Sequence, residues 1–161
     1  MKKKVSKRKF NLKVLIICFA IVAVVAFLGS IFMGNSADSS WYQSIKPSIT
    51  PPNYVFPIAW TTLFILIAIS LYFAWTRANE KQKITVAILF AFSFFFNVIW
   101  TLFYFNLHNV GLALIDLLLL WISIIAIILV VRKISKASAY LLIPYLMWIT
   151  FAGVLNYLSL R

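Results

Sequence analysis

Five long apolar segments divide the chain, and short polar or charged stretches separate them. The segments cover residues 14–33, 57–75, 84–105, 111–131 and 140–158, and each is free or nearly free of charged side chains. A helix of about 20 residues rises about 1.5 Å per residue and crosses a hydrocarbon layer of about 30 Å. Because the alternation typical of barrel strands is missing, the pattern predicts five transmembrane helices.

The connections between these segments predict how the helices are arranged. Residues 76–83, 106–110 and 132–139 form short connections, so consecutive helices should pack antiparallel. The sequence therefore predicts an all-α membrane protein with one domain, a five-helix bundle over residues 14–161. A basic tail over residues 1–13 precedes it. We expect the first apolar segment to be a retained helix, since it is longer than a signal-peptide core and lacks an A-x-A cleavage site.

One connection, residues 34–56, is long and rich in proline. It contains Pro47, Pro51 and Pro52, and prolines at this density restrict the backbone to a few extended conformations. One interpretation is a stiff external loop that caps a central pocket in the bundle. The other is a plain connector in which Trp41 and Tyr42 anchor the chain at the membrane interface. Composition alone leaves both open.

Composition and charge support a membrane location and predict the orientation. The chain is 64% hydrophobic and 11% charged, which leaves too few polar residues to cover a water-soluble domain. If every segment crosses once, thirteen of the 15 Lys and Arg residues lie on the side of the N-terminus. The positive-inside rule then places the N-terminus in the cytoplasm and the C-terminus outside a cell membrane. The net charge of +12 fits contact with anionic lipid better than nucleic-acid binding.

Polar and aromatic residues recur at helical spacing on three of the predicted helices. The third carries an amide, an indole, a hydroxyl and a phenol at i, i+3, i+4 and i+7: Asn97, Trp100, Thr101 and Tyr104. The second carries Trp60 and Phe64 on one face, and the fifth carries Tyr145, Trp148, Ala152 and Asn156. Converging faces would enclose a cavity for a large, planar, mostly apolar molecule. Alternatively, these residues hold the helices together by hydrogen bonds of about 0.6 kcal/mol each.

Other single residues suggest less specific roles. Asp116 in the fourth helix is consistent with a proton or ion site, but a hydrogen bond to a neighbouring helix is the simpler expectation. The spacing of Leu155, Tyr157 and Arg161 fits a loose pattern proposed for sterol contact. Neither Cys18 nor His108 has partners for a disulfide or a metal site, so we expect no bound metal.

The order of five sequence motifs resembles a known family. The motifs WYQSIKPSITPP, FPIAWT, NVIWTLFY, ALIDLLL and LLIPYLMWITFAGVLN run from Trp41 to Asn156. They resemble the tryptophan-rich sensory protein and translocator protein family (TspO/MBR), also called peripheral-type benzodiazepine receptors. The resemblance implies a five-helix bundle, often a homodimer, whose pocket binds porphyrins such as protoporphyrin IX, isoquinoline carboxamides, benzodiazepines and, in some members, sterols. It implies no obligatory cofactor, because the porphyrin is a ligand or substrate.

Individual positions can be matched to the family pocket. The resemblance implies ligand contacts at Tyr42 and Pro51 on the lid, and on the helices at Trp60, Phe64, Asn97, Trp100, Thr101, Tyr104, Trp148 and Ala152. It also matches Trp60 and Trp148 to two indoles linked to porphyrin photochemistry. WYQSIKP is one residue shorter than the family pattern, and Ile49 stands where an aromatic is common. Both departures lie in the long loop.

Three function classes follow from these expectations. A receptor or sensor would bind a flat ligand by ring stacking. An enzyme would use Trp60 and Trp148 as catalytic electron or radical relays for light- and oxygen-dependent porphyrin breakdown, since the pocket positions offer no ordinary hydrolytic or metal-dependent chemistry. A transporter would need alternating access, but the five segments show neither inverted repeats nor paired broken helices. Binding requires the fewest assumptions, and we take it as the primary expectation.

Overall fold

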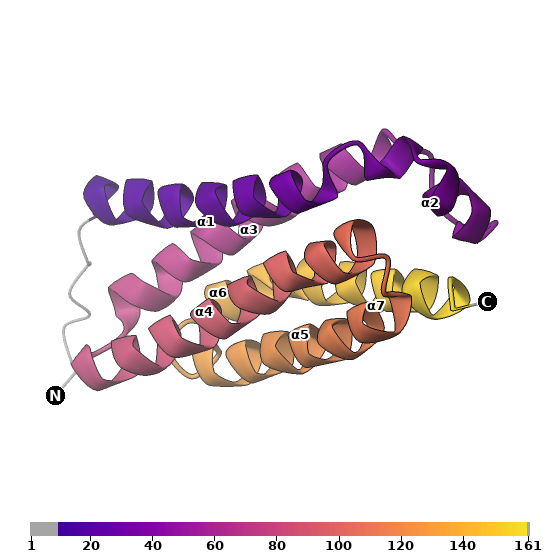
Figure 1. Cartoon of the computed structure of the whole chain (residues 1–161). Helices are drawn as coiled ribbons and strands as arrows, with labels where there is room; N and C mark the ends of the chain where they lie inside the picture. Colours follow the sequence, from indigo (N-terminus) through magenta and orange to yellow (C-terminus); the bar gives the residue numbers. More distant parts are fainter. Residues whose placement is uncertain (1–9, 161) are drawn as a thin grey trace, which may run out of the picture.

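The computed structural model describes residues 10–160, which form helices and connecting loops without a strand in that range. Five helical stretches in it are long and apolar enough to span a membrane, which confirms the predicted fold class (Figure 1). The helices are α1 (Leu12–Met33), α2 (Ser40–Ile45), α3 (Val55–Arg77), α4 (Glu80–Thr101), α5 (Val110–Val131), α6 (Lys136–Leu141) and α7 (Ile143–Leu158). The basic tail predicted over residues 1–13 lies mostly outside the described residues.

Side-chain caps explain why the helices start earlier than hydropathy alone predicts. Asn11 accepts a hydrogen bond from the Val14 backbone N–H at the start of α1, and Asn109 does the same for Leu112 at the start of α5. At the start of α4, Asn79 and Gln82 form a reciprocal capping box. These caps satisfy N–H groups that have no partner within the first turn of a helix.

The fifth predicted span is two helices in the structure. It begins at Lys136 as α6, which ends at Leu141, and it continues as α7 from Ile143. Pro144 occupies the first turn of α7, where the missing N–H of proline removes no helical hydrogen bond. The interruption lies at the end of the bundle where α3 finishes, and α6 packs there against α3.

The bundle consists of two groups of helices. In Figure 1, α1 and α3 lie together on one side, and α4, α5 and α7 lie together on the other. The core is centred on α5, where Leu120, Ile124, Ile127 and Val131 are at most 1% exposed. Many apolar side chains of α1 and α4 face outward, including Phe27 and Phe95, as expected of a surface solvated by lipid.

Serine hydrogen bonds close one end of the bundle. The Ser70 and Ser138 hydroxyls each donate to the other residue's backbone carbonyl at 2.9 Å, which holds α3 against α6. Nearby, the Arg77 guanidinium donates to the Ser135 hydroxyl at 2.8 Å. Because α6 also packs against α5, these bonds join the two groups of helices at this end. We call the opposite end the pocket end.

The proline-rich connection at the pocket end contains a short helix of its own. Residues 34–54, which we call the cap segment, include a 3₁₀ turn (η1, Ser36–Asp38) and α2, whose N-cap Ser39 accepts from the Tyr42 N–H. Tyr42 and Pro47 are buried, whereas Ile49 and Tyr54 are exposed. The segment is therefore packed onto the bundle at Tyr42, which a plain connector with Trp41 and Tyr42 at the membrane interface would not require.

A pair of isoleucines on α5 tests the placement of the core. Ile124→Ala should lower the stability by about 2–5 kcal/mol, because the fully buried side chain would leave a cavity. Ile122 is 57% exposed on the same helix, so Ile122→Ala should cost little. Thermal unfolding of both variants in detergent measures the difference. Equal losses of stability would contradict the assignment of the buried face of α5.

Candidate functional site

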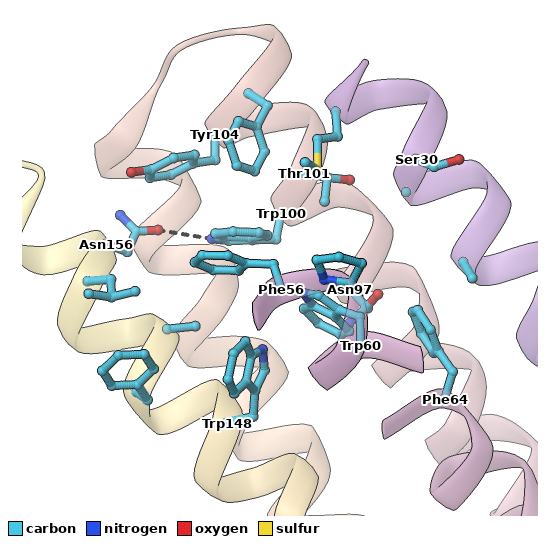
Figure 2. Close-up of a pocket in the computed structure, with 18 of the residues that line it drawn as sticks. Ser30, Phe56, Trp60, Phe64, Asn97, Trp100, Thr101, Tyr104, Trp148 and Asn156 are labelled. Atoms are coloured by element: carbon cyan, nitrogen blue, oxygen red, sulfur yellow. Dashed lines mark hydrogen bonds between the residues drawn. The ribbon is translucent and has the colours of Figure 1, made fainter. Parts of the chain in front are cut away.

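A cavity of about 410 Å³ lies between the two groups of helices at the pocket end. Its size falls within the range of about 300–1,000 Å³ that is common for small-molecule sites. The wall is formed by parts of α1, α3, α4, α7 and the cap segment, and Figure 2 shows aromatic rings from several of these elements around it.

Nine of the ten residues expected at the site line this cavity: Tyr42, Trp60, Phe64, Asn97, Trp100, Thr101, Tyr104, Trp148 and Ala152. Pro51 is not among the lining residues. It lies in the cap segment after α2, and Asn53 and Phe56 are the residues near it that reach the cavity. A proline ring is short, so an adjacent amide and phenyl group extend further into the space.

Sequence reasoning missed the contribution of α1. Ala26, Gly29, Ser30 and Met33 line the cavity at i, i+3, i+4 and i+7, a helical stripe of mostly small residues. The stripe is visible in the sequence, but it carries no aromatic ring and only one polar group. A Cβ added at Gly29 would lie in ordinary van der Waals contact with the Thr101 side chain at 3.8 Å, so α1 lies close to the end of α4 here.

The polar stripe of α4 and of the helical turn that follows it makes hydrogen bonds to α7 and to Ser159, the residue after α7. Asn97 Nδ2 donates to the Tyr145 hydroxyl, Trp100 Nε1 donates to Asn156 Oδ1, and the Tyr104 hydroxyl donates to Ser159 Oγ, each at 2.9 Å. Asn156 Nδ2 in turn donates to the Val110 carbonyl at the start of α5. The two interpretations of this stripe are therefore compatible, since the same residues join the helices and line the cavity.

Aromatic contacts fix the orientation of several rings on the wall. Trp100 and Tyr104 are stacked with ring centroids 5.2 Å apart, and Trp60 lies 5.3 Å from Phe64. Phe56 meets Trp148 edge to face at 5.9 Å, across the space between α3 and α7. Figure 2 shows Trp60, Trp100 and Trp148 arranged around a common space. Such a wall suits a flat apolar guest, because rings pack against ring faces and edges.

A π-helical turn places the last ring of this wall. After Thr101 the helix continues as η2 (Leu102–Asn106), and Tyr104 and Phe105 on it are buried. Single π-helical turns within α-helices often occur at functional sites, since they shift side chains from the α-helical register. His108 follows with a positive φ of 52°, and this sharp turn leads directly into α5.

The cap segment contacts the bundle mainly through aromatic rings. Tyr42 lies 5.7 Å from Phe105 and 6.4 Å from Tyr104, and Trp41 stacks on His108 at 4.0 Å. Burial, together with the nearby Tyr104 phenol, raises the pKa of Tyr42 to about 12. The neutral phenol is thus the form that the packed cap segment favours.

The polar groups on the cavity wall are neutral. Among the described residues that line the cavity, none is acidic, basic, histidine or cysteine, and the polar groups are amides, hydroxyls and indoles. No group of three or more potential metal ligands occurs in residues 10–160. Asp116, on α5, is 4% exposed and does not line the cavity, and its Oδ2 has no hydrogen-bond partner there. The hydrogen bond to a neighbouring helix that the sequence favoured is therefore not made by this oxygen.

Comparisons with known proteins agree with the geometry. The model of the TspO/MBR family matches residues 17–161. The chain is 35% identical to the tryptophan-rich protein TspO of Chlorobaculum tepidum, over 91% of this chain and 94% of that protein. It is 38% identical to the protein of the same name from Archaeoglobus fulgidus, over 91% and 95%. It is also 33% identical to the translocator protein of Bos taurus, over 73% and 71%.

The ionisation of Tyr42 tests how firmly the cap segment is packed. The difference in tyrosinate absorbance between the wild type and Tyr42→Phe should show a step near pH 12, above the value of about 10 for a free phenol. Because the pKa of Tyr42 is raised in the folded protein, the buried neutral phenol contributes fully to stability below about pH 10. This contribution is lost as the pH rises through about 12.

Tyr54→Phe is the control for this titration, because Tyr54 is 67% exposed in the same segment. The Tyr54→Phe substitution should not remove the titration step near pH 12. A Tyr42 step near pH 10 would show that the phenol is not buried against η2.

Proposed function

The chain belongs to the TspO/MBR family, and we propose that it is a membrane receptor or sensor that binds porphyrins, such as protoporphyrin IX, in the cavity at the pocket end. Isoquinoline carboxamides and benzodiazepines, which are also mostly apolar and contain aromatic rings, are further ligands of this proposal. The observation that carries it is the convergence of indole, phenol and phenyl rings from α3, α4, η2, α7 and the cap segment on one cavity.

The shape and polarity of the wall support a planar guest. Trp60 and Phe64 on α3 face a space shared with Trp100 on α4 and Trp148 on α7, so a flat molecule can contact rings on more than one side. Several polar wall groups are already paired within the protein, including the Asn97 amide nitrogen and the Trp100 indole N–H. Ring contacts therefore supply most of the binding energy, and few hydrogen bonds are left to orient the ligand.

The proposal also covers the location, orientation and oligomeric state of the protein. We place the protein in the cell membrane as a multi-pass protein with a cytoplasmic N-terminus, because the cationic residues concentrate on that side of the chain. The pocket end then faces outward, and the cap segment covers the cavity from there. We further propose a homodimer in contact with membrane lipid, including sterol where the membrane contains it. Only family membership supports the homodimer in this proposal.

A second candidate function is light-dependent breakdown of a bound porphyrin. The observation that favours it is that both indoles considered for this chemistry, Trp60 and Trp148, line the cavity. Trp60 also lies 6.4 Å from the Tyr145 ring, so an oxidised indole would have a phenol within short electron-transfer range. Transport is the third candidate. Uptake of the porphyrin into sealed vesicles that contain the protein would be the evidence for it.

Binding is tested by adding protoporphyrin IX to the protein in detergent in the dark and following tryptophan fluorescence. The wild type should show saturable quenching. Trp148→Leu should weaken binding about tenfold, because the loss of one ring contact of about 1.4 kcal/mol changes the affinity by that factor.

Trp121→Leu is the matched control, since Trp121 lies on α5 outside the cavity and donates its indole N–H to Thr150. Its affinity should equal that of the wild type. Absence of saturable quenching in the wild type, or equal weakening by both substitutions, would contradict the proposed site.

Illumination separates the receptor from the enzyme. If the protein degrades porphyrin, the bound pigment should bleach in light and oxygen, and Trp60→Phe and Trp148→Phe should slow the bleaching while Trp121→Phe does not. Bleaching at the wild-type rate in both cavity variants would rule out the relay role, and the receptor proposal would be unaffected.

A further inference from the structure

A carboxyl group lies buried in the bundle without a partner for one of its oxygens. Asp116 is on the second turn of α5, it is 4% exposed, and its Oδ2 makes no hydrogen bond within residues 10–160. The single ion pair in the described part of the chain joins Lys83 to Glu80 at the start of α4, which is the opposite end of the bundle. Asp116 thus forms no ion pair with a Lys or Arg residue in the described part of the chain.

The neighbouring elements offer only neutral groups to this carboxyl. From α7 the Tyr145 phenol interacts with it electrostatically, and on α4 the neutral side chains of Ser93 and Asn97 interact with that phenol. From η2 the Tyr104 hydroxyl is directed to Ser159, and on α6 the charged Lys136 is exposed at the other end of α5. A carboxylate here would be an unpaired charge in a low-dielectric interior, which is strongly unfavourable, so the group is expected to carry a proton.

The same neighbours connect Asp116 to the cavity. The Tyr145 hydroxyl accepts a hydrogen bond from Asn97 Nδ2 at 2.9 Å and also interacts with Ser93. Asn97 lines the cavity, whereas Tyr145 lies behind the wall at 2% exposure. The phenol that interacts electrostatically with the buried carboxyl is therefore also hydrogen-bonded to an amide that a ligand would contact.

From this arrangement we propose that Asp116 is a proton-binding site in the membrane interior, and that Tyr145 and Asn97 couple its protonation to occupation of the cavity. The coupling rests on the proposed function, but the bound proton does not. A ligand displaces water from the cavity and makes the surroundings of Asp116 less polar, which disfavours the carboxylate. Ligand binding and proton retention should therefore stabilise each other, as thermodynamic linkage requires.

Infrared spectroscopy of the ligand-free protein in lipid vesicles tests the bound proton directly. At about neutral pH, the wild type should show the carbonyl stretch of a protonated carboxylic acid, and transfer to heavy water should shift it. Asp116→Asn should abolish this band, because the amide keeps the shape of the side chain but has no acidic proton. Tyr145→Phe should keep the band and move its frequency.

Glu80→Gln is the matched control, since Glu80 is exposed and ion-paired with Lys83. It should leave the band unchanged. Absence of the band in the wild type, or its persistence in Asp116→Asn, would overturn the assignment of a proton to Asp116. The isotope shift in the wild type would still reveal a protonated carboxyl if the variant failed to fold.

The coupling is tested with an isoquinoline carboxamide that stays neutral over the pH range used. Its affinity for the wild type should fall as the pH rises from about 6 to about 9, by up to about tenfold per pH unit above the carboxyl's transition. The affinity of Asp116→Asn should not change with pH, and Tyr145→Phe should show a smaller change than the wild type. The same pH dependence in Asp116→Asn as in the wild type, or none in the wild type, would overturn the coupling. If the probe does not bind at all, the proposed function fails, while the infrared result still decides the proton.

Discussion

Polar groups within the hydrocarbon layer must find their partners inside the protein, and this constraint determines how the helices of the bundle face one another. Lipid offers no hydrogen bonds, so an amide or indole N–H turned outward would stay unsatisfied. The side chains of Asn97, Trp100 and Asn156 meet this requirement by pairing across α4, α5 and α7. These pairs fix the rotation of α4 and α7, and the aromatic rings that share their faces turn inward as a result.

The same hydrogen bonds explain how a cavity can persist in a tightly packed bundle. At one end, the Ser70 and Ser138 backbone contacts bring α3 and α6 together. At the pocket end, α3 diverges from α4 and α7, and bulky rings such as Trp60 and Trp148 line the gap without filling it. Unfilled volume forfeits packing energy, so a cavity of this size is destabilising unless other contacts offset it. The α4–α7 hydrogen bonds and the aromatic contacts of Tyr42 provide such an offset.

The sequence predicted the five spans and nine of the residues that line the cavity, mainly from patterns within single segments, and it predicted the family from the order of five motifs. Asn97, Trp100, Thr101 and Tyr104 stand out since polar residues at helical spacing in a membrane span are expected to face other helices or a cavity rather than lipid. The small residues of α1 around Gly29 were missed, because a small side chain has no chemical signature of its own. The π-helical turn after Thr101 and the unpaired oxygen of Asp116 depend on tertiary packing, which no local pattern encodes. The break before Ile143 has a local signal in Pro144, but hydropathy alone does not reveal it.

The central claim is that rings from three helices surround one planar guest, and a structure of the protein with bound protoporphyrin IX tests it most directly. The account predicts that the macrocycle lies between Trp60, Trp100 and Trp148, with Tyr42 of the cap segment above it and Asn97 in contact. A macrocycle bound on the outward face of α1 or α4, with the cavity left unoccupied, would contradict the claim.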